Sequence, residues 1–257
     1  MKYLKIFLFV FLPMLAFGQQ TEGSIIYEQT VDVHRRLTGE RERFKQFVPK
    51  TMSQKFELKF NNTASMFKTY IDEEEDPGPG GGRRRFRFFG GGAEGEMYRN
   101  FETLQFVNSR EFQGKNYLIK GEIDQTPWKI TGQSREIMGY PCMQAIYDDT
   151  LEQRELTAWF TPNIPVTAGP STYGQLPGLI LALDINNGEV VFRPIEVNFD
   201  AVTEKDLQEP KKGKEIEKEE FEVMLRERME EMRKQRQAEG GGRPGGGRPG
   251  GGRPGGN

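Results

Sequence analysis

The sequence of 257 residues has little of two residue types that carry chemistry: it contains one cysteine, Cys142, and one histidine, His34. A single cysteine cannot form an internal disulfide, even in an oxidising compartment. A single histidine nearly excludes a histidine-based catalytic triad and a metal site with two histidines. We therefore expect a non-catalytic protein with no cofactor, no metal site and no catalytic residues.

Long apolar runs are absent after the first 18 residues, so we expect a soluble mature chain. Residues 1–18 have the pattern of a secretory signal peptide, because Lys2 and Lys5 precede the apolar run Ile6–Leu15 and Gly18 ends the segment. An N-terminal membrane anchor is the alternative, although the run is short for a span. No cysteine sits at the expected cleavage point, which argues against a lipoprotein. Export to the periplasm or cell envelope is expected.

Glycine and charged residues are unevenly distributed along the chain. They concentrate at about 72–96 and after about 204, whereas the sequence between has ordinary apolar content and can bury one core. The chain is therefore expected to contain a signal peptide (1–18), a β-rich domain (19–203) with a low-complexity loop insertion (72–96), a linker and charged helix (204–239), and a tail of Gly-Gly-Gly-Arg-Pro repeats (240–257).

Alternating apolar residues predict strands throughout the β-rich domain. In Lys55–Phe60, the side chains of Phe56, Leu58 and Phe60 share one face and the charged residues occupy the other. The segment Gln29–Lys50 stays open between a longer strand, a helix and a loop. Similar patterns predict further strands at Ser24–Val33, Ser65–Tyr70, Tyr98–Asn108, Tyr117–Gly121, Met143–Tyr147, Glu155–Phe160, Leu179–Asp184, Val190–Arg193 and Ile195–Phe199.

The strongest hairpin signal is Asn186-Asn187-Gly188, because Asn-Gly tolerates the positive φ angles of a type I′ turn. Many strands with one buried face and turn signals between them indicate an antiparallel sheet. The predicted fold is mainly β, a strongly curved antiparallel sheet or a partly open β-barrel, followed by a charged helix and a disordered tail rich in Gly, Arg and Pro.

The loop insertion combines an acidic run, 72–76, with an Arg-Phe run between glycine-rich segments. We favour a tolerated expansion of a surface loop, since loops of this composition are cheap to lengthen. The alternative is contact with an anionic surface, in which arginine supplies bidentate donors and phenylalanine stacks or inserts. The residues of that candidate contact are Arg83, Arg84, Arg85, Phe86, Arg87, Phe88 and Phe89.

The C-terminal region begins with Lys214–Glu239, which is rich in Glu, Lys, Arg and Met and contains no glycine or proline. This composition predicts a helix that packs on the sheet, pairs with a partner or, as we favour, is solvated. The following repeats predict disorder. An Arg-Gly tail is typical of RNA binding, but the signal peptide and the acidic balance of the mature chain argue against a nucleic-acid partner.

A series of motifs extends from Trp128 to Leu181. It contains Trp128-Lys129-Ile130-Thr131, Gly139-Tyr140-Pro141-Cys142 and the hexapeptide Gln175–Ile180. This series resembles the GLPGLI family of exported Bacteroidetes proteins, with Gln175 at the position where the family typically has glycine. The resemblance implies an exported, β-rich protein of uncharacterised function, and it supplies no catalytic residues.

In physical terms the hexapeptide connects a turn to a strand. Pro177-Gly178 suits a type II turn, and Leu179–Leu183 is expected to re-enter the sheet as a buried strand. One interpretation is that the loop caps the core and binds nothing. The other is that it lines an apolar pocket. The candidate contact and closure residues are Trp159, Tyr173, Leu176, Pro177, Gly178, Leu179 and Ile180.

Two classes of function remain from the sequence. The first is a non-catalytic binding or scaffold protein of the envelope, which holds an apolar ligand or docks an outer-membrane or envelope partner. The second is a hydrolase or other enzyme, disfavoured because no nucleophile or metal motif is present. Asp124, Asp148 and Asp149 show no spacing that separates catalytic carboxylates from residues at strand ends. Cys142 is expected to be buried and inert, since no partner that activates a thiolate is identifiable.

Overall fold

The computed structural model of the protein describes residues 20–71, 95–150 and 152–240. The predicted signal peptide, the Arg-Phe run 83–89 and the repeats of the tail lie outside these residues. The described strands are β1 (Gly23–Asp32), β2 (Thr51–Phe60), β3 (Ala64–Thr69), β4 (Met97–Asn100), β5 (Gln105–Phe112), β6 (Lys115–Glu122), β7 (Lys129–Ile137), β8 (Tyr140–Asp149), β9 (Arg154–Thr161), β10 (Leu179–Ile185), β11 (Val190–Asn198) and β12 (Lys214–Glu217).

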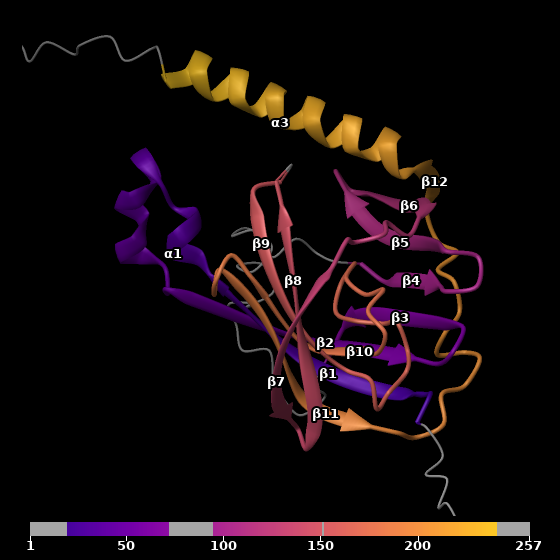
Figure 1. The fold of residues 1–257 in the computed structure, drawn as a ribbon. Helices are drawn as coiled ribbons and strands as arrows, with labels where there is room; N and C mark the ends of the chain where they lie inside the picture. The colour runs from indigo at the N-terminus through magenta and orange to yellow at the C-terminus, as the bar shows by residue number, and fades with distance from the viewer. Residues whose placement is uncertain (1–19, 72–94, 151, 241–257) are drawn as a thin grey trace, which may run out of the picture.

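The described strands form one twelve-stranded sheet in the order β12-β6-β5-β4-β3-β2-β1-β11-β10-β9-β8-β7. Neighbouring strands pair antiparallel, except that β12 runs parallel to β6. The early strand β1 lies in the middle, between β2 and the late strand β11. The predicted curved, open antiparallel sheet is therefore confirmed (Figure 1).

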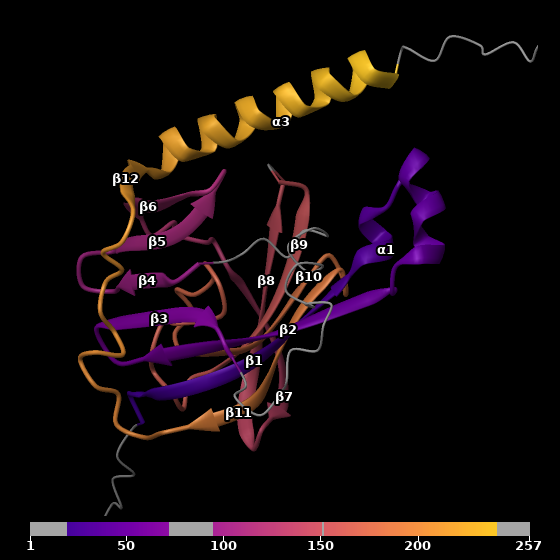
Figure 2. The same cartoon turned by 180° about the vertical axis from the view of Figure 1, so that it is seen from behind.

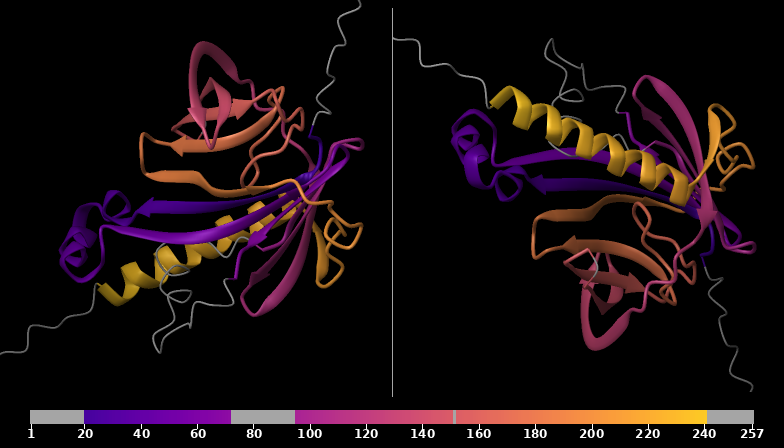
Figure 3. Two further views of the ribbon diagram at one scale, coloured as in Figure 1. Left: turned by 90° about the horizontal axis from the view of Figure 1, so that it is seen from below. Right: turned by 90° about the horizontal axis from the view of Figure 1, so that it is seen from above.

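Curvature of the sheet gives the molecule two arms, which we define as β3–β6 and β7–β10 (Figures 1 and 3). Strands β2 and β3 carry an aromatic cluster in which the rings of Phe56 and Phe67 stack with centroids 5.0 Å apart. Phe192 of β11 lies against both rings at 6.4 Å. These side chains are 1% exposed, as the alternation of β2 predicts.

The loop 162–178, between β9 and β10, packs inside the curve of the sheet. Ile164 and Ala168 have no exposed surface, and Val166 and Leu176 are 2% exposed. The backbone of the loop is bonded to the start of β10, since the amide of Leu179 donates to the carbonyl of Ile164 at 3.0 Å. The loop thus fills the concave side of the sheet with apolar side chains.

Two of the sequence-based strand assignments are wrong. The predicted strands Val190–Arg193 and Ile195–Phe199 are one continuous strand, β11. The predicted strand Tyr98–Asn108 is two strands, β4 and β5, separated by a tight turn. The side chain of Asn100 accepts from the amides of Glu102 and Thr103, both at 2.9 Å, and Leu104 has φ +55°. The turn contains neither glycine nor proline, so the alternation pattern does not reveal it.

The segment Gln29–Lys50 contains parts of three elements. Strand β1 continues to Asp32, whose side chain caps the short helix α1 (Val33–Arg36) by accepting from the amide of Arg35 at 3.2 Å. A 3-10 helix, η1 (Gly39–Phe47), follows before β2 begins. The charge-rich centre of this segment is therefore a helical excursion at the end of the β1–β2 hairpin.

The C-terminal helix α3 spans Lys218–Gly240, so it begins four residues later than predicted because Lys214–Glu217 pairs with β6 as β12. Phe221 anchors the first turn of α3 and is 3% exposed, with its ring 5.7 Å from those of Phe112 and Tyr117. The side chains described beyond Met229 are exposed, as expected for a solvated helix. Neither α3 nor any other helix in the described ranges has the length and apolar character to cross a membrane.

Cys142 lies on β8 with no exposed surface, which confirms the predicted burial. Its Sγ donates weakly to the carbonyl of Tyr140 at 3.4 Å. Burial raises the pKa of the thiol to about 11, although the neighbouring Arg135 guanidinium acts in the opposite direction. At neutral pH the residue is therefore a protonated core side chain and a poor nucleophile.

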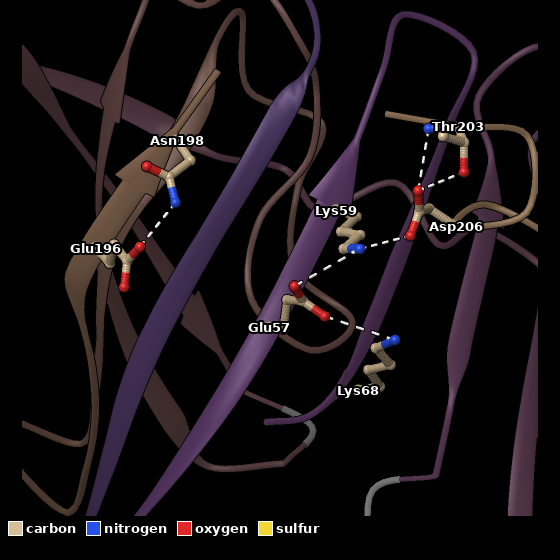
Figure 4. A network of polar contacts seen from close by, with 7 residues as sticks. All are labelled: Glu57, Lys59, Lys68, Glu196, Asn198, Thr203 and Asp206. Atoms are coloured by element: carbon tan, nitrogen blue, oxygen red, sulfur yellow. Dashed lines mark hydrogen bonds and ion pairs between the residues drawn. The ribbon is translucent and has the colours of Figure 1, made fainter. Parts of the chain in front are cut away.

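A strap, residues 199–213, connects β11 with β12 and runs past one end of the strands that lie between them (Figure 2). A polar network fixes it to β2 (Figure 4). Lys59 donates to Asp206 at 2.5 Å and lies 3.9 Å from Glu57, while the amide and hydroxyl of Thr203 donate to Asp206 at 3.0 and 2.6 Å. The network therefore ties the strap to a central strand of the sheet.

Asp206 is expected to make stability depend on pH in the acid range. Hydrogen bonds from Lys59 and Thr203 lower the pKa of Asp206 to about 2, below the value of about 3.9 in an unfolded chain. Its contribution is present above pH ~4 and is lost as pH falls towards 2. Since the pair is near the surface, we expect less than about 1 kcal/mol.

This expectation is tested by thermal unfolding of the native chain and of Asp206→Asn between pH 5 and pH 2. The native chain should have the higher melting temperature at pH 5, and the difference should shrink as the pH falls. A difference that is constant across the range would contradict the assignment to Asp206.

Candidate functional site

A cleft of about 510 Å³ opens between the two arms of the sheet, and it is the candidate functional site. Residues from both arms, from the segment 123–127, from the loop 162–178 and from the base of α3 line it. The charged and tyrosine side chains of the lining are Arg99, Asp124, Tyr147, Asp149, Glu152, Arg154, Tyr173, Lys218 and Glu222. The curvature of the sheet brings these segments together.

Arg99 of β4 is the most deeply buried charged residue of the cleft, with 2% of its surface exposed. Its Nη1 donates to the carbonyl of Tyr173 at 2.9 Å, and its guanidinium lies 5.8 Å from the ring of Phe101. Within the described ranges, Arg99 forms no ion pair with a carboxylate. Burial accordingly lowers the pKa of Arg99 to about 10, so it remains a cation at neutral pH.

Arg154 begins β9 on the opposite arm and donates through Nη2 to Asp149 at 2.9 Å. Its Nε is buried and has no acceptor in the described part of the chain. Burial acts to lower the pKa of Arg154, but Tyr173, Asp149 and Glu152 outweigh it and the net direction is upwards. Arg154 is thus a cation held in place by Asp149, and its Nε–H donor has no acceptor in the described residues.

Lys218 and Asp124 close one side of the cleft. Lys218 Nζ donates to Asp124 at 2.6 Å, which joins the base of α3 to the segment 123–127. Burial acts to lower the pKa of Lys218, but the bond to Asp124 outweighs it and the pKa is raised. The salt bridge therefore links two segments that are 94 positions apart in the sequence.

Aromatic side chains form the remaining wall. The ring of Tyr147 stands edge-on to Trp128, with centroids 6.2 Å apart. The indole of Trp128 donates to the carbonyl of Gly174 at 2.9 Å. This bond joins the motif that begins at Trp128 to the loop that carries the hexapeptide Gln175–Ile180. The cleft therefore combines aromatic faces with cationic donors, an arrangement suited to a small polar ligand.

Gln175 occupies the position where the GLPGLI pattern has glycine, and its φ of +60° explains that preference. With the side-chain amide turned so that its oxygen faces the guanidinium, that oxygen accepts from Nη2 of Arg99 and the amide nitrogen donates to the carbonyls of Gly174 and Asp124, both at 3.2 Å. Gln175 therefore combines a strained backbone with a neutral partner for the buried arginine.

Two substitutions at Gln175 separate the strain from the bonds. Both Gln175→Ala and Gln175→Gly lose the side-chain hydrogen bonds. The positive φ is unfavourable for alanine but not for glycine, so only Gln175→Ala retains the backbone strain. We expect Gln175→Gly to be more stable than Gln175→Ala by about 1 kcal/mol. Urea unfolding measures the difference, and an alanine variant at least as stable as the glycine variant would rule out strain at this position.

The structure separates the predicted contact residues instead of placing them in one apolar pocket. Leu176, Leu179 and Ile180 are core residues with 2, 0 and 0% exposure. Gly178 is buried and Pro177 is exposed. Tyr173 alone of the predicted set lines the cleft.

Trp159 faces away from the cleft. It lines a different hollow, of about 340 Å³, on the other face of β7–β11. There the guanidinium of Arg135 covers its ring at 4.0 Å from the centroid. Trp159 and Leu176, expected as walls of one pocket, therefore lie on opposite faces of the sheet.

The turn at Pro177-Gly178 also differs from the prediction. The amide of Gly178 donates to the carbonyl of Leu176 at 2.7 Å, which closes a three-residue turn around Pro177 in place of a type II turn. Gly178 has φ +151°, far from the value of about +80° that a type II turn requires. The tighter turn lets Leu179 enter β10 directly opposite Thr161.

Arg99 is the residue that the sequence argument missed. The alternation Met97, Arg99, Phe101 places it on an apolar face, and this was the signal that could have identified it. Asp149 and Arg154 flank the turn between β8 and β9 and give no comparable signal. Their position opposite Arg99 follows from the curvature of the sheet.

Residues 148–182 match a family described as protein of unknown function (Porph_ging), which is associated with Bacteroidetes. The match covers β9, the loop 162–178 and the start of β10, which together hold Arg154 and Tyr173. No curated protein matches the chain.

Among solved structures, two of PNGF-II, in the C2 and P21 space groups, are similar in fold, each with a TM-score of 0.53 and 15% sequence identity. The alignments cover 80% and 79% of this chain but only 32% and 33% of those chains. The chain therefore corresponds to about a third of the length of these proteins, and at this identity the similarity concerns the fold alone.

Proposed function

We propose that the protein is an exported, non-catalytic binding protein of the GLPGLI type, which holds a small polar ligand in the cleft between the arms of its sheet. The observation that carries the proposal is the cleft itself. Both arms, the loop 162–178 and α3 contribute to it, and its donors include a buried arginine. We place its action in the periplasm or cell envelope, on the basis of the predicted signal peptide.

A polar ligand suits this site better than an apolar one. A lipid carrier needs a hollow with apolar walls inside the curved sheet. The loop 162–178 occupies that space with Ile164, Val166 and Leu176. The open volume between the arms includes apolar side chains such as Met97 and Ile123, but it also presents the charged and aromatic groups named above.

A second candidate is an enzyme, and one specific observation favours it. The cleft gathers the carboxylates of Asp149 and Glu152 with the phenols of Tyr147 and Tyr173, a set with which acid-base catalysis is possible. Asp149, however, is paired with Arg154. The ion pair makes a structural or binding role the simpler interpretation.

The test is affinity capture of small molecules and lipids from envelope extract, followed by mass spectrometry of the bound material. Thr172→Trp places an indole at the cleft wall, and Gln133→Trp makes the same change on the exposed edge strand β7 as a matched control. The native chain and the control should retain a polar ligand that Thr172→Trp loses. Capture of the same lipid by all three proteins would contradict the proposal, and conversion of the bound ligand during incubation would favour the enzyme.

A further inference from the structure

We propose that the cleft recognises a carboxylate group of its ligand, held between Arg99 and Arg154. This inference rests on the proposed binding function and names the chemistry of the ligand. The two arginines come from opposite arms, and both line the same hollow. A ligand carboxylate would therefore bridge the arms.

Arg99 is a buried cation whose hydrogen-bond acceptors in the described ranges are all neutral. A guanidinium carries five N–H donors, and those of Arg99 with an acceptor contact neutral oxygens of Tyr173 and Gln175. A buried cation without a counter-ion is unfavourable. A carboxylate in the cleft would supply the missing negative charge without requiring Arg99 to move to solvent.

Arg154, on the opposite arm, has a donor without an acceptor among the described residues. Its Nη2 is occupied by Asp149, but its Nε is buried without an acceptor in the described part of the chain. The side chain lines the cleft and is 38% exposed. The guanidinium therefore has N–H groups besides those facing Asp149 that can donate to a carboxylate in the cleft.

The surrounding charges favour a singly charged anion. Asp149 and Asp124 are already paired with Arg154 and Lys218. Glu152 and Glu222 also line the cleft and would repel a ligand of high negative charge such as a phosphate dianion. A carboxylate on an otherwise neutral or amine-bearing molecule fits this balance, and both the C-terminus of a short peptide and a sugar acid have this chemistry.

Binding to the purified mature chain can be measured by isothermal titration calorimetry with two matched pairs of probes. Triglycine is compared with triglycinamide, and D-glucuronate with D-glucose, so that each pair differs in the carboxylate. We expect at least one carboxylate probe to bind and its neutral counterpart to bind about tenfold more weakly or not at all. The pair that responds identifies the source as peptide or sugar.

Substitutions assign the binding to the two arginines. Arg154→Gln should weaken the carboxylate probe about tenfold or more, whereas Arg193→Gln, in the hollow beneath Trp159, should leave it unchanged. Arg99→Gln should do the same as Arg154→Gln. Its fold is checked by near-UV circular dichroism because Arg99 also holds the loop at Tyr173. If Arg99→Gln does not fold, Arg154→Gln decides.

The inference is overturned if neither pair shows carboxylate-dependent binding, or if Arg154→Gln binds the carboxylate probe as well as the native chain does. A ligand captured from extract and lost by Thr172→Trp would still support the proposed function in that case. Failure of the inference and failure of the proposed function are therefore distinguishable.

Discussion

Replacing Gly178 by alanine is expected to destabilise the protein by about 3 kcal/mol or more. A Cβ at this position would lie 2.2 Å from the carbonyl oxygen of Thr161 and 2.9 Å from the Cα of Pro162. Both obstacles are backbone atoms at the end of β9, where Thr161 pairs with Leu179. The clash can be relieved only by separating β9 from β10, because no flexible side chain is available to move.

Gly188→Ala is the matched control for this prediction. Gly188 also has a positive φ, +93°, but a Cβ there would meet no atom within 4 Å. It should cost only the backbone strain of about 1 kcal/mol. Urea unfolding at neutral pH measures both variants. If Gly178→Ala is no less stable than Gly188→Ala, close approach of the backbone is not what this glycine provides.

Phe56→Ala should have an effect of similar size, about 3–5 kcal/mol. Phe56 is 1% exposed, and its ring stacks on Phe67 at 5.0 Å and contacts Phe192 at 6.4 Å. Truncation removes the buried ring, its aromatic contacts and the packing between β2, β3 and β11, and it leaves a cavity. Stabilities of small proteins are about 5–15 kcal/mol, so the variant could be largely unfolded at 37 °C.

Phe47→Ala makes the same chemical change at a residue that is 74% exposed, at the end of η1. Its expected effect is within about 0.5 kcal/mol. Equal losses in Phe56→Ala and Phe47→Ala, measured by calorimetry, would contradict the aromatic cluster as the centre of the core.

The strands with one buried face could be predicted from the sequence. In β2 the apolar residues alternate with charged ones, and the aromatic residues lie in the core as the period of two requires. The same reasoning identified β1. These two strands carry their own signal because solvent and core lie on opposite sides of each strand. Strand β10, which is buried on both faces, was indicated by its apolar run, and the hairpin before β11 by Asn186-Asn187-Gly188.

The elements that could not be predicted depend on distant partners. Strand β12 has the composition of a helix and is a strand because it pairs with Tyr117–Lys120 of β6. Strand β7 is exposed at eight of its nine positions, so it shows no alternation of buried and exposed residues. Tertiary pairing overrides local preference in both cases.

The candidate site was predicted only in part. The sequence identified Tyr173 and the loop that holds it, but it indicated an apolar contact surface. Arg99, Arg154 and Lys218 come from three separate segments, and nothing local indicates that they share a cleft. These three residues line one cleft because the sheet is curved, and that curvature depends on the packing of the whole core.

The central position of β1 also governs the order in which the molecule can fold. Tyr27 donates its hydroxyl to the carbonyl of Ile180, 153 positions away, and β1 pairs along its length with β11. One edge of β1 therefore stays unpaired until the chain has been synthesised beyond Asn198. Contacts of such long range are associated with slow folding. Truncation before β11 would leave β1 as a long, apolar, open edge, which is a template for aggregation.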